Sequence, residues 1–91
     1  MATITLDAKH WKCADDFYTS YCAATDAPKW FGRNLSALAD SFRGGICKIT
    51  AEKIVVRGLT KGIKGALGHG FWSSVVEICL DEAVELEIHS D

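Results

Sequence analysis

The sequence has no excess of basic residues, no long apolar run and no closely spaced pair of cysteines. Its 91 residues hold 10 lysines and arginines against 12 aspartates and glutamates, a formal net charge of −2. Such a chain lacks the basic footprint of a nucleic-acid-binding domain. No apolar run approaches the roughly 18 residues that cross a membrane. We therefore expect no direct nucleic-acid contact and no membrane span.

A secretory signal is also missing. The first ten residues, MATITLDAKH, show no basic segment followed by an apolar core, which favours a cytoplasmic protein. The four cysteines, Cys13, Cys22, Cys47 and Cys79, form no CxxC pair. In a reducing compartment free thiols are expected rather than disulfides. A zinc site is expected still less, because its ligands are usually closely paired, and no cofactor is implied.

What is present is typical of one folded domain spanning residues 1–91. Hydrophobic residues make up 48% of the chain and charged residues 24%, and no repeat, linker or low-complexity segment interrupts it. The charges are unevenly spread, with cations in the middle of the chain and acids crowded at its end: Asp81, Glu82, Glu85, Glu87 and Asp91. An acidic patch of this kind can steer a basic partner.

Hydrophobic periodicity predicts strands at residues 2–7, 53–57 and 84–89 and helices at 14–25, 35–43 and 71–83. The glycine-rich segment LTKGIKGALGHG indicates a short helical turn within a loop, and ICKIT is compatible with a strand or an extended loop. The two longer helices should turn their apolar side chains to the core, namely Ala14, Phe17, Tyr18, Tyr21, Cys22 and Thr25 in the first and Phe71, Trp72, Val75, Val76, Cys79 and Leu80 in the second.

Helical crossovers between strands imply a parallel sheet with right-handed connections. We therefore predict an α/β fold: a three-stranded parallel sheet in the order 1-2-3, with three to four helices packed on one face. The continuous apolar run at 53–57 is expected in the middle strand, because a middle strand is covered most fully. The alternating runs are expected at the two edges.

The stretch PKWFGRNLSALADSFRGG, residues 28–45, organises the chain. Pro28 ends the preceding element, and Asn34 is a good N-cap for the short helix that follows. Gly44 and Gly45 supply a left-handed stop. The apolar stripe of this helix consists of Leu35, Leu38 and Phe42, and its polar face shows Ser36, Asp40 and Arg43. A helix this short must be docked to be stable, which would display its polar face rigidly.

The same stretch resembles the barstar family, intracellular inhibitors of the bacterial ribonuclease barnase. The matching residues are Pro28, Trp30, Phe31, Gly32, Asn34, Leu35, Ala37, Leu38, Asp40 and Gly44. The resemblance implies a small three-stranded parallel fold. It also implies an inhibitor, not an enzyme, that binds a ribonuclease as its protein partner and covers its active site. We expect a monomer in the free state.

Residue chemistry alone favours Asp40 as an ordinary solvated aspartate. The resemblance reverses this, because Asp40 matches the dominant inhibitory aspartate of the family, a carboxylate that stands in for a phosphate. Trp30 matches an interface tyrosine, so we assign Trp30 to the partner and Phe31 to the core; packing of both in the core or at its rim remains the alternative. Glu82 matches a peripheral glutamate that pairs with the ribonuclease, or is a solvated acid at a helix end.

Three positions depart from the family pattern. Ser36 stands where the family prototype has a second interface aspartate, Ala39 where it has a tryptophan, and Arg43 where it has a threonine. Arg43 can also pair with Asp40 at helical spacing. The partner-binding set is therefore Trp30, Asn34, Ser36, Ala39, Asp40, Arg43, Gly44 and Glu82, with a smaller and less acidic face than the prototype. Binding to barnase itself is thereby in doubt.

Two other functions remain open. One is a barstar-fold binding or immunity protein for a partner other than a ribonuclease. The other is a small enzyme that uses His69 or a cysteine, although no catalytic pair is recognisable. The glycine-rich segment lacks the GxxxxGK[ST] pattern of a phosphate-binding loop.

Overall fold

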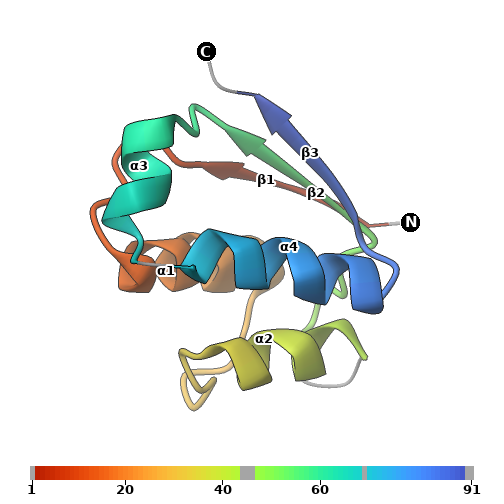
Figure 1. Cartoon of the computed structure of the whole chain (residues 1–91). Coiled ribbons are helices and arrows are strands. Elements are labelled where there is room, and N and C mark those ends of the chain that lie inside the picture. The colour runs from red at the N-terminus through yellow and green to blue at the C-terminus, as the bar shows by residue number, and fades with distance from the viewer. Residues whose placement is uncertain (1, 44–46, 69, 90–91) are drawn as a thin grey trace.

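The computed structural model describes residues 2–43, 47–68 and 70–89. Its elements in chain order are β1 (Thr3–Asp7), α1 (Ala14–Thr25), α2 (Leu35–Phe42), β2 (Lys53–Arg57), α3 (Lys61–Ala66), α4 (Phe71–Asp81) and β3 (Glu85–His89). The sheet has the order β1-β2-β3, and both strand pairs are parallel. Figure 1 shows α1 and α4 beneath the sheet and α2 in a further layer below them. The predicted fold class and strand order are confirmed.

Among the described residues, only one face of the sheet is covered. In β1 and β2 every second side chain is buried, beginning with Ile4 and Ile54, which are register partners. On the other face Lys53 Nζ lies 3.0 Å from Glu85 Oε2 and 3.4 Å from Glu87 Oε1. A parallel sheet is usually covered on both faces, and these polar pairs allow this one to face water.

The middle strand is β2, as predicted, and its Val55 is half-buried where the matching position of β1 is exposed. β3 is more open than its alternating pattern suggests. Val84, just before it, is buried and Leu86 is half-buried, but Ile88 is 37% exposed. As an edge strand, β3 has a neighbour on one side only.

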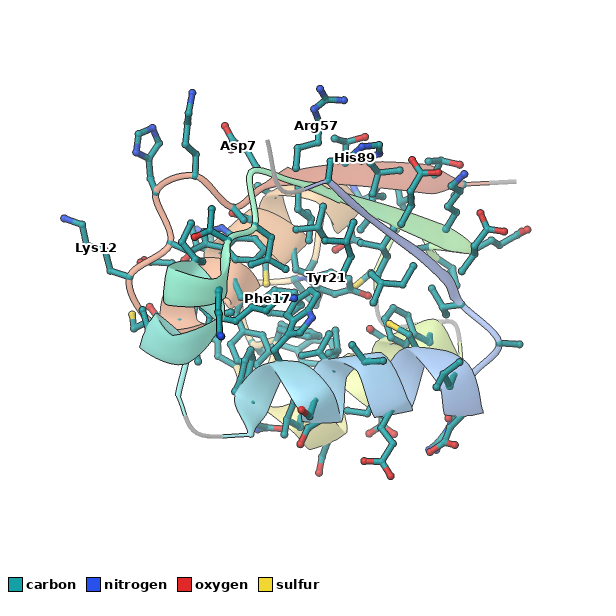
Figure 2. All side chains as sticks on the ribbon, turned by 45° about the horizontal axis from the view of Figure 1, so that its top comes forward. Asp7, Lys12, Phe17, Tyr21, Arg57 and His89 are labelled. Atoms are coloured by element: carbon teal, nitrogen blue, oxygen red, sulfur yellow. The ribbon has the colours of Figure 1, made fainter. Side chains whose placement is uncertain are left out.

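An aromatic cluster fills the space between the sheet and the helices. Phe17 and Tyr21 of α1 are almost fully buried, and their rings stack with centroids 6.1 Å apart. Phe71 and Trp72 of α4 meet Phe17 edge-on. Figure 2 shows Phe17 and Tyr21 between the sheet and the helices, and Asp7 and Arg57 pointing away from them. The α1 side chains predicted for the core are buried or half-buried there.

One core prediction for α4 is wrong. Trp72, Val75 and Cys79 are buried, whereas Leu80 is 74% exposed. The buried positions recur every three or four residues, and Leu80 follows the last of them by one residue. Its side chain is therefore turned by about 100° around the helix axis, away from the core. The helix also ends at Asp81, two residues before the predicted end.

The segments between these elements were predicted less sharply. The glycine-rich segment contains α3, a helix of 6 residues capped by the Thr60 side chain. Of the two alternatives for ICKIT, its described part, residues 47–50, is loop. All four cysteines are free, and Cys47 and Cys79 are buried. Among the described residues no helix has both the length and the apolar character needed to cross a membrane.

Candidate protein-binding surface

The loop before α2 is held where it enters the helix, by the adjacent residues Arg33 and Asn34. Asn34 caps the helix as predicted, because its Oδ1 accepts a hydrogen bond of 2.8 Å from the Ala37 amide. Arg33 reaches across to α1, where its Nε donates to Asp15 Oδ1 at 2.5 Å and its Nη2 donates to the Asp15 carbonyl at 2.8 Å and to the Thr19 hydroxyl. These contacts fix how the chain enters α2.

The neighbouring aromatic residues in this loop face opposite ways. Phe31 is 5% exposed and its ring lies 6.1 Å from that of Tyr21. Trp30 is 73% exposed. Phe31 thus belongs to the core, as predicted, and Trp30 presents an aromatic surface to solvent; its contact with a partner stays a prediction.

The two sides of α2 differ as its periodicity predicted. Leu38 and Phe42 are buried and Leu35 is half-buried. Ser36, Asp40 and Arg43 are exposed, and Ala39 is half-buried. Ser41 is also buried, which the sequence did not predict, because a serine in an amphipathic helix carries no sign of the partner that it meets in the core.

Arg43 joins the two acids predicted for the site. Its Nη1 lies 3.1 Å from Asp40 Oδ1 within α2, as the helical spacing predicted, and its Nη2 lies 3.0 Å from Glu82 Oε2 at the end of α4. The hydrogen bond to Glu82, followed by its charge, raises the pKa of the Arg43 guanidinium above its usual value. The contact places Glu82 beside α2, although 39 residues separate it from Arg43 in the chain.

Most of the predicted binding residues therefore lie on α2, at its caps or in contact with its C-cap, and Trp30 is exposed in the loop before it. We call them the α2 surface: Trp30, Asn34, Ser36, Ala39, Asp40, Arg43 and Glu82. Gly44, the remaining member of the predicted set, and the predicted stop at Gly44 and Gly45 lie outside the described residues. Arg33 was missed as well, because its contacts with Asp15 and Thr19 cross 14 to 18 residues and leave no local pattern.

Other kinds of site have less support. His69, the candidate base, lies outside the described residues, which contain no group of three or more side chains suited to hold a metal ion. A hollow of about 500 Å³ is lined by residues of α3, of α4 and of the segment between them. None of its described lining residues belongs to the α2 surface.

Comparison with known protein families shows to which family the chain belongs. The family described as Barstar (barnase inhibitor) matches residues 1–89. The chain belongs to the Barstar family. The family is one of inhibitors rather than enzymes, and the match covers every element of the fold. A comparison with curated proteins gave no significant match. The structure describes Ser36, Ala39 and Asp40 on α2 and Arg43 as its C-cap, and the roles that the resemblance implies for them stay predictions.

Proposed function

We propose that this chain inhibits a ribonuclease by covering its active site with the α2 surface. In this proposal the Asp40 carboxylate takes the place of a substrate phosphate. The observation that supports it most directly is the position of Asp40, exposed over 56% of its side chain on a short helix that is anchored to the core.

The chemistry follows from what a ribonuclease must bind. Its active site holds a phosphodiester with cationic groups, and a carboxylate offered to these groups forms charge-assisted hydrogen bonds. A carboxylate held in place before binding loses little conformational freedom in the complex. Asn34 fixes one end of α2, and Arg43 links the other end to α4.

The other members of the α2 surface lie on the same short helix, at its caps or beside it. Trp30 offers a large aromatic area with few rotatable bonds, which suits the centre or border of a protein interface. Ser36 and Ala39 have short side chains, so a partner can approach the helix closely there. Asn34 contributes by capping α2, by contacting the partner, or by both. In this proposal the chain is one domain, acts as a monomer and protects the cytoplasm from a ribonuclease that is self-secreted or delivered by a neighbouring cell.

The decisive experiment is inhibition of a panel of small microbial ribonucleases, including barnase, at low salt. Asp40→Asn removes one charge with almost no change in shape. Asp7→Asn is the matched control, because Asp7 lies on β1 and points away from the helices (Figure 2). We expect Asp40→Asn to weaken inhibition at least about thirtyfold, as for a hot-spot residue of about 2 kcal/mol or more, and Asp7→Asn to leave it unchanged. Inhibition that survives Asp40→Asn, or no inhibition of any ribonuclease, would refute the proposal.

A second candidate is a partner protein that is not a ribonuclease. It is favoured by Arg43, which offsets the acidic charge of Asp40 and Glu82 and makes this surface less suited to a strongly cationic site. Capture of partners from the parent organism with the unmodified chain and with Asp40→Asn separates the two candidates. A captured nuclease supports the first, and a different protein lost in the Asp40→Asn capture supports the second.

A further inference from the structure

At the edge of the α2 surface, the Glu82 side chain is largely buried and is in contact with the more exposed side chain of Arg43. The guanidinium meets Glu82 Oε2 through Nε at 3.2 Å and through Nη2 at 3.0 Å. The Glu82 side chain is 18% exposed, whereas the Arg43 side chain is 62% exposed. At this edge the charge that a partner would meet first is therefore positive.

Arg43 still has hydrogen-bonding capacity. A guanidinium carries five N–H donors, one on Nε and two on each terminal nitrogen. The single Nε hydrogen is shared between the two Glu82 oxygens, and described residues engage Nη1 once, through Asp40, and Nη2 once, through Glu82. One N–H on Nη1 and one on Nη2 remain, on a side chain that is more than half exposed. An acceptor on a partner can bind them without breaking the contacts to Asp40 and Glu82.

We propose that Arg43, and not Glu82, makes the contact at this edge, and that the ribonuclease supplies a carboxylate to receive it. This inference rests on the proposed function and adds the chemistry of the partner. The resemblance implies an acid of the inhibitor at this edge, paired with a cation of the ribonuclease. Here the polarity of the pair is reversed. The partner thus presents a cationic pocket for Asp40 and, beside it, an acidic group for Arg43.

A carboxylate is the group that fits this position best among protein side chains. The planar guanidinium matches its two oxygens, and the bonds are charge-assisted. A lysine or arginine of the partner in the same place would face a cation and be repelled. Arg43 would therefore act as a specificity residue, favouring ribonucleases with an acid beside the active site and disfavouring those that are cationic throughout.

General electrostatics and this inference predict opposite effects for loss of Arg43. A ribonuclease that binds phosphates is cationic at its active site, so removal of a cation from the inhibitor should by itself tighten the complex. If a carboxylate of the ribonuclease pairs with Arg43, the removal instead leaves that carboxylate without its partner, and dissociation becomes faster. The sign of the change separates the two.

The test uses a ribonuclease from the panel that the unmodified chain inhibits, with dissociation rates measured for Arg43→Met, Arg43→Lys and Asp40→Asn. We expect Arg43→Met to increase the dissociation rate about tenfold and Arg43→Lys, which keeps the charge but not the planar fork, to fall in between. A ribonuclease variant in which the facing carboxylate becomes an amide should then respond little to Arg43→Met.

The outcomes distinguish this inference from the proposed function. Unchanged or tighter binding by Arg43→Met, with Asp40→Asn still weakening the complex, overturns the role of Arg43 and keeps the ribonuclease inhibitor. If the unmodified chain inhibits no ribonuclease, the proposed function fails, and this inference fails with it.

Discussion

The hydroxyl of Tyr21 in α1 lies 2.6 Å from the hydroxyl of Ser41 in α2, and both are buried. Ser41 Oγ also lies 2.6 Å from the Leu38 carbonyl, which can only accept. The single Ser41 proton is thus donated to Leu38, and Tyr21 is the donor to Ser41. Because Ser41 follows Asp40 directly, this bond fixes the rotation of α2 that turns the Asp40 side chain toward solvent.

We expect Tyr21→Phe to lower the free energy of unfolding by about 1–2 kcal/mol, since it removes a buried hydrogen bond and keeps the ring. Ser41→Ala should cost about 1–3 kcal/mol, because it leaves the buried Tyr21 hydroxyl without an acceptor. Urea unfolding measures both. Tyr18→Phe is the control, because the Tyr18 hydroxyl has no hydrogen-bond partner among the described residues. Equal losses from Tyr18→Phe and Tyr21→Phe would show that the Tyr21–Ser41 bond adds nothing.

Much of the fold was predictable because its signals are local. Alternation around Ile4 and helical spacing from Phe17 to Thr25 depend on neighbouring residues alone, and the crossover rule then orders the strands. The exposure of Leu80 could not be predicted from the local pattern. Leu80 lies within an apolar stretch of the sequence, but its exposure depends on which flank of α4 has a neighbour, and periodicity does not contain that information.

In the candidate site, too, contacts between near neighbours in the sequence were predictable and contacts between distant elements were not. Asn34 was predictable as a cap, because the amide that it binds is three residues away. The Arg43–Asp40 pair was predictable from helical spacing for the same reason. Arg33 and Ser41 meet their partners in α1, and Arg43 meets Glu82 across 39 residues. Such contacts exist only once the chain has folded.

The aromatic pair before α2 separates stability from binding. Phe31→Ala should lower the free energy of unfolding by about 3–5 kcal/mol, because it opens a cavity beside Tyr21. Trp30→Ala should leave thermal unfolding nearly unchanged, because Trp30 is exposed, and should weaken binding to an inhibited ribonuclease. Thermal unfolding and titration with that ribonuclease measure the two effects. A loss of stability without a loss of affinity in Trp30→Ala would place Trp30 outside the interface.

Alkaline pH should destabilise the protein. Burial raises the pKa of Tyr18 from 10.0 to about 12 and the pKa of Cys79 from 9.0 to about 11, and it also raises the pKa of Tyr21. The folded state thus keeps protons that the unfolded chain releases, so stability is retained below pH 9 and falls as the pH rises through the unfolded values toward the folded ones.

The urea midpoint should therefore decrease progressively above pH 9, and Tyr21→Phe should make its decrease above pH 10 shallower. Tyrosinate absorbance provides an independent check. The chain has two tyrosines, both buried, so their ionisation should accompany unfolding rather than precede it. Phenolate that appears near pH 10 in a protein that is still folded would contradict the shifts.

The four thiols should react in an order set by exposure and by the fraction present as thiolate, the reactive form. Cys13 is exposed and should react first with a thiol reagent. Cys22 should be slower, because it is half-buried and burial raises its pKa. Cys47 and Cys79 are buried and should react only when the protein unfolds. Peptide mapping after timed labelling assigns each rate, and Cys13→Ser should remove the fast phase.

The same labelling tests the enzyme hypothesis. A catalytic cysteine needs a lowered pKa and an accessible sulfur, which would make it react faster than an ordinary free thiol. Cys22 and Cys79 have raised pKa values, so neither has this character. We expect the fast phase at Cys13 to match the rate of a short peptide with the same local sequence. A clearly faster reaction at any of the four cysteines would point to an activated thiolate and would reopen the possibility of an enzyme.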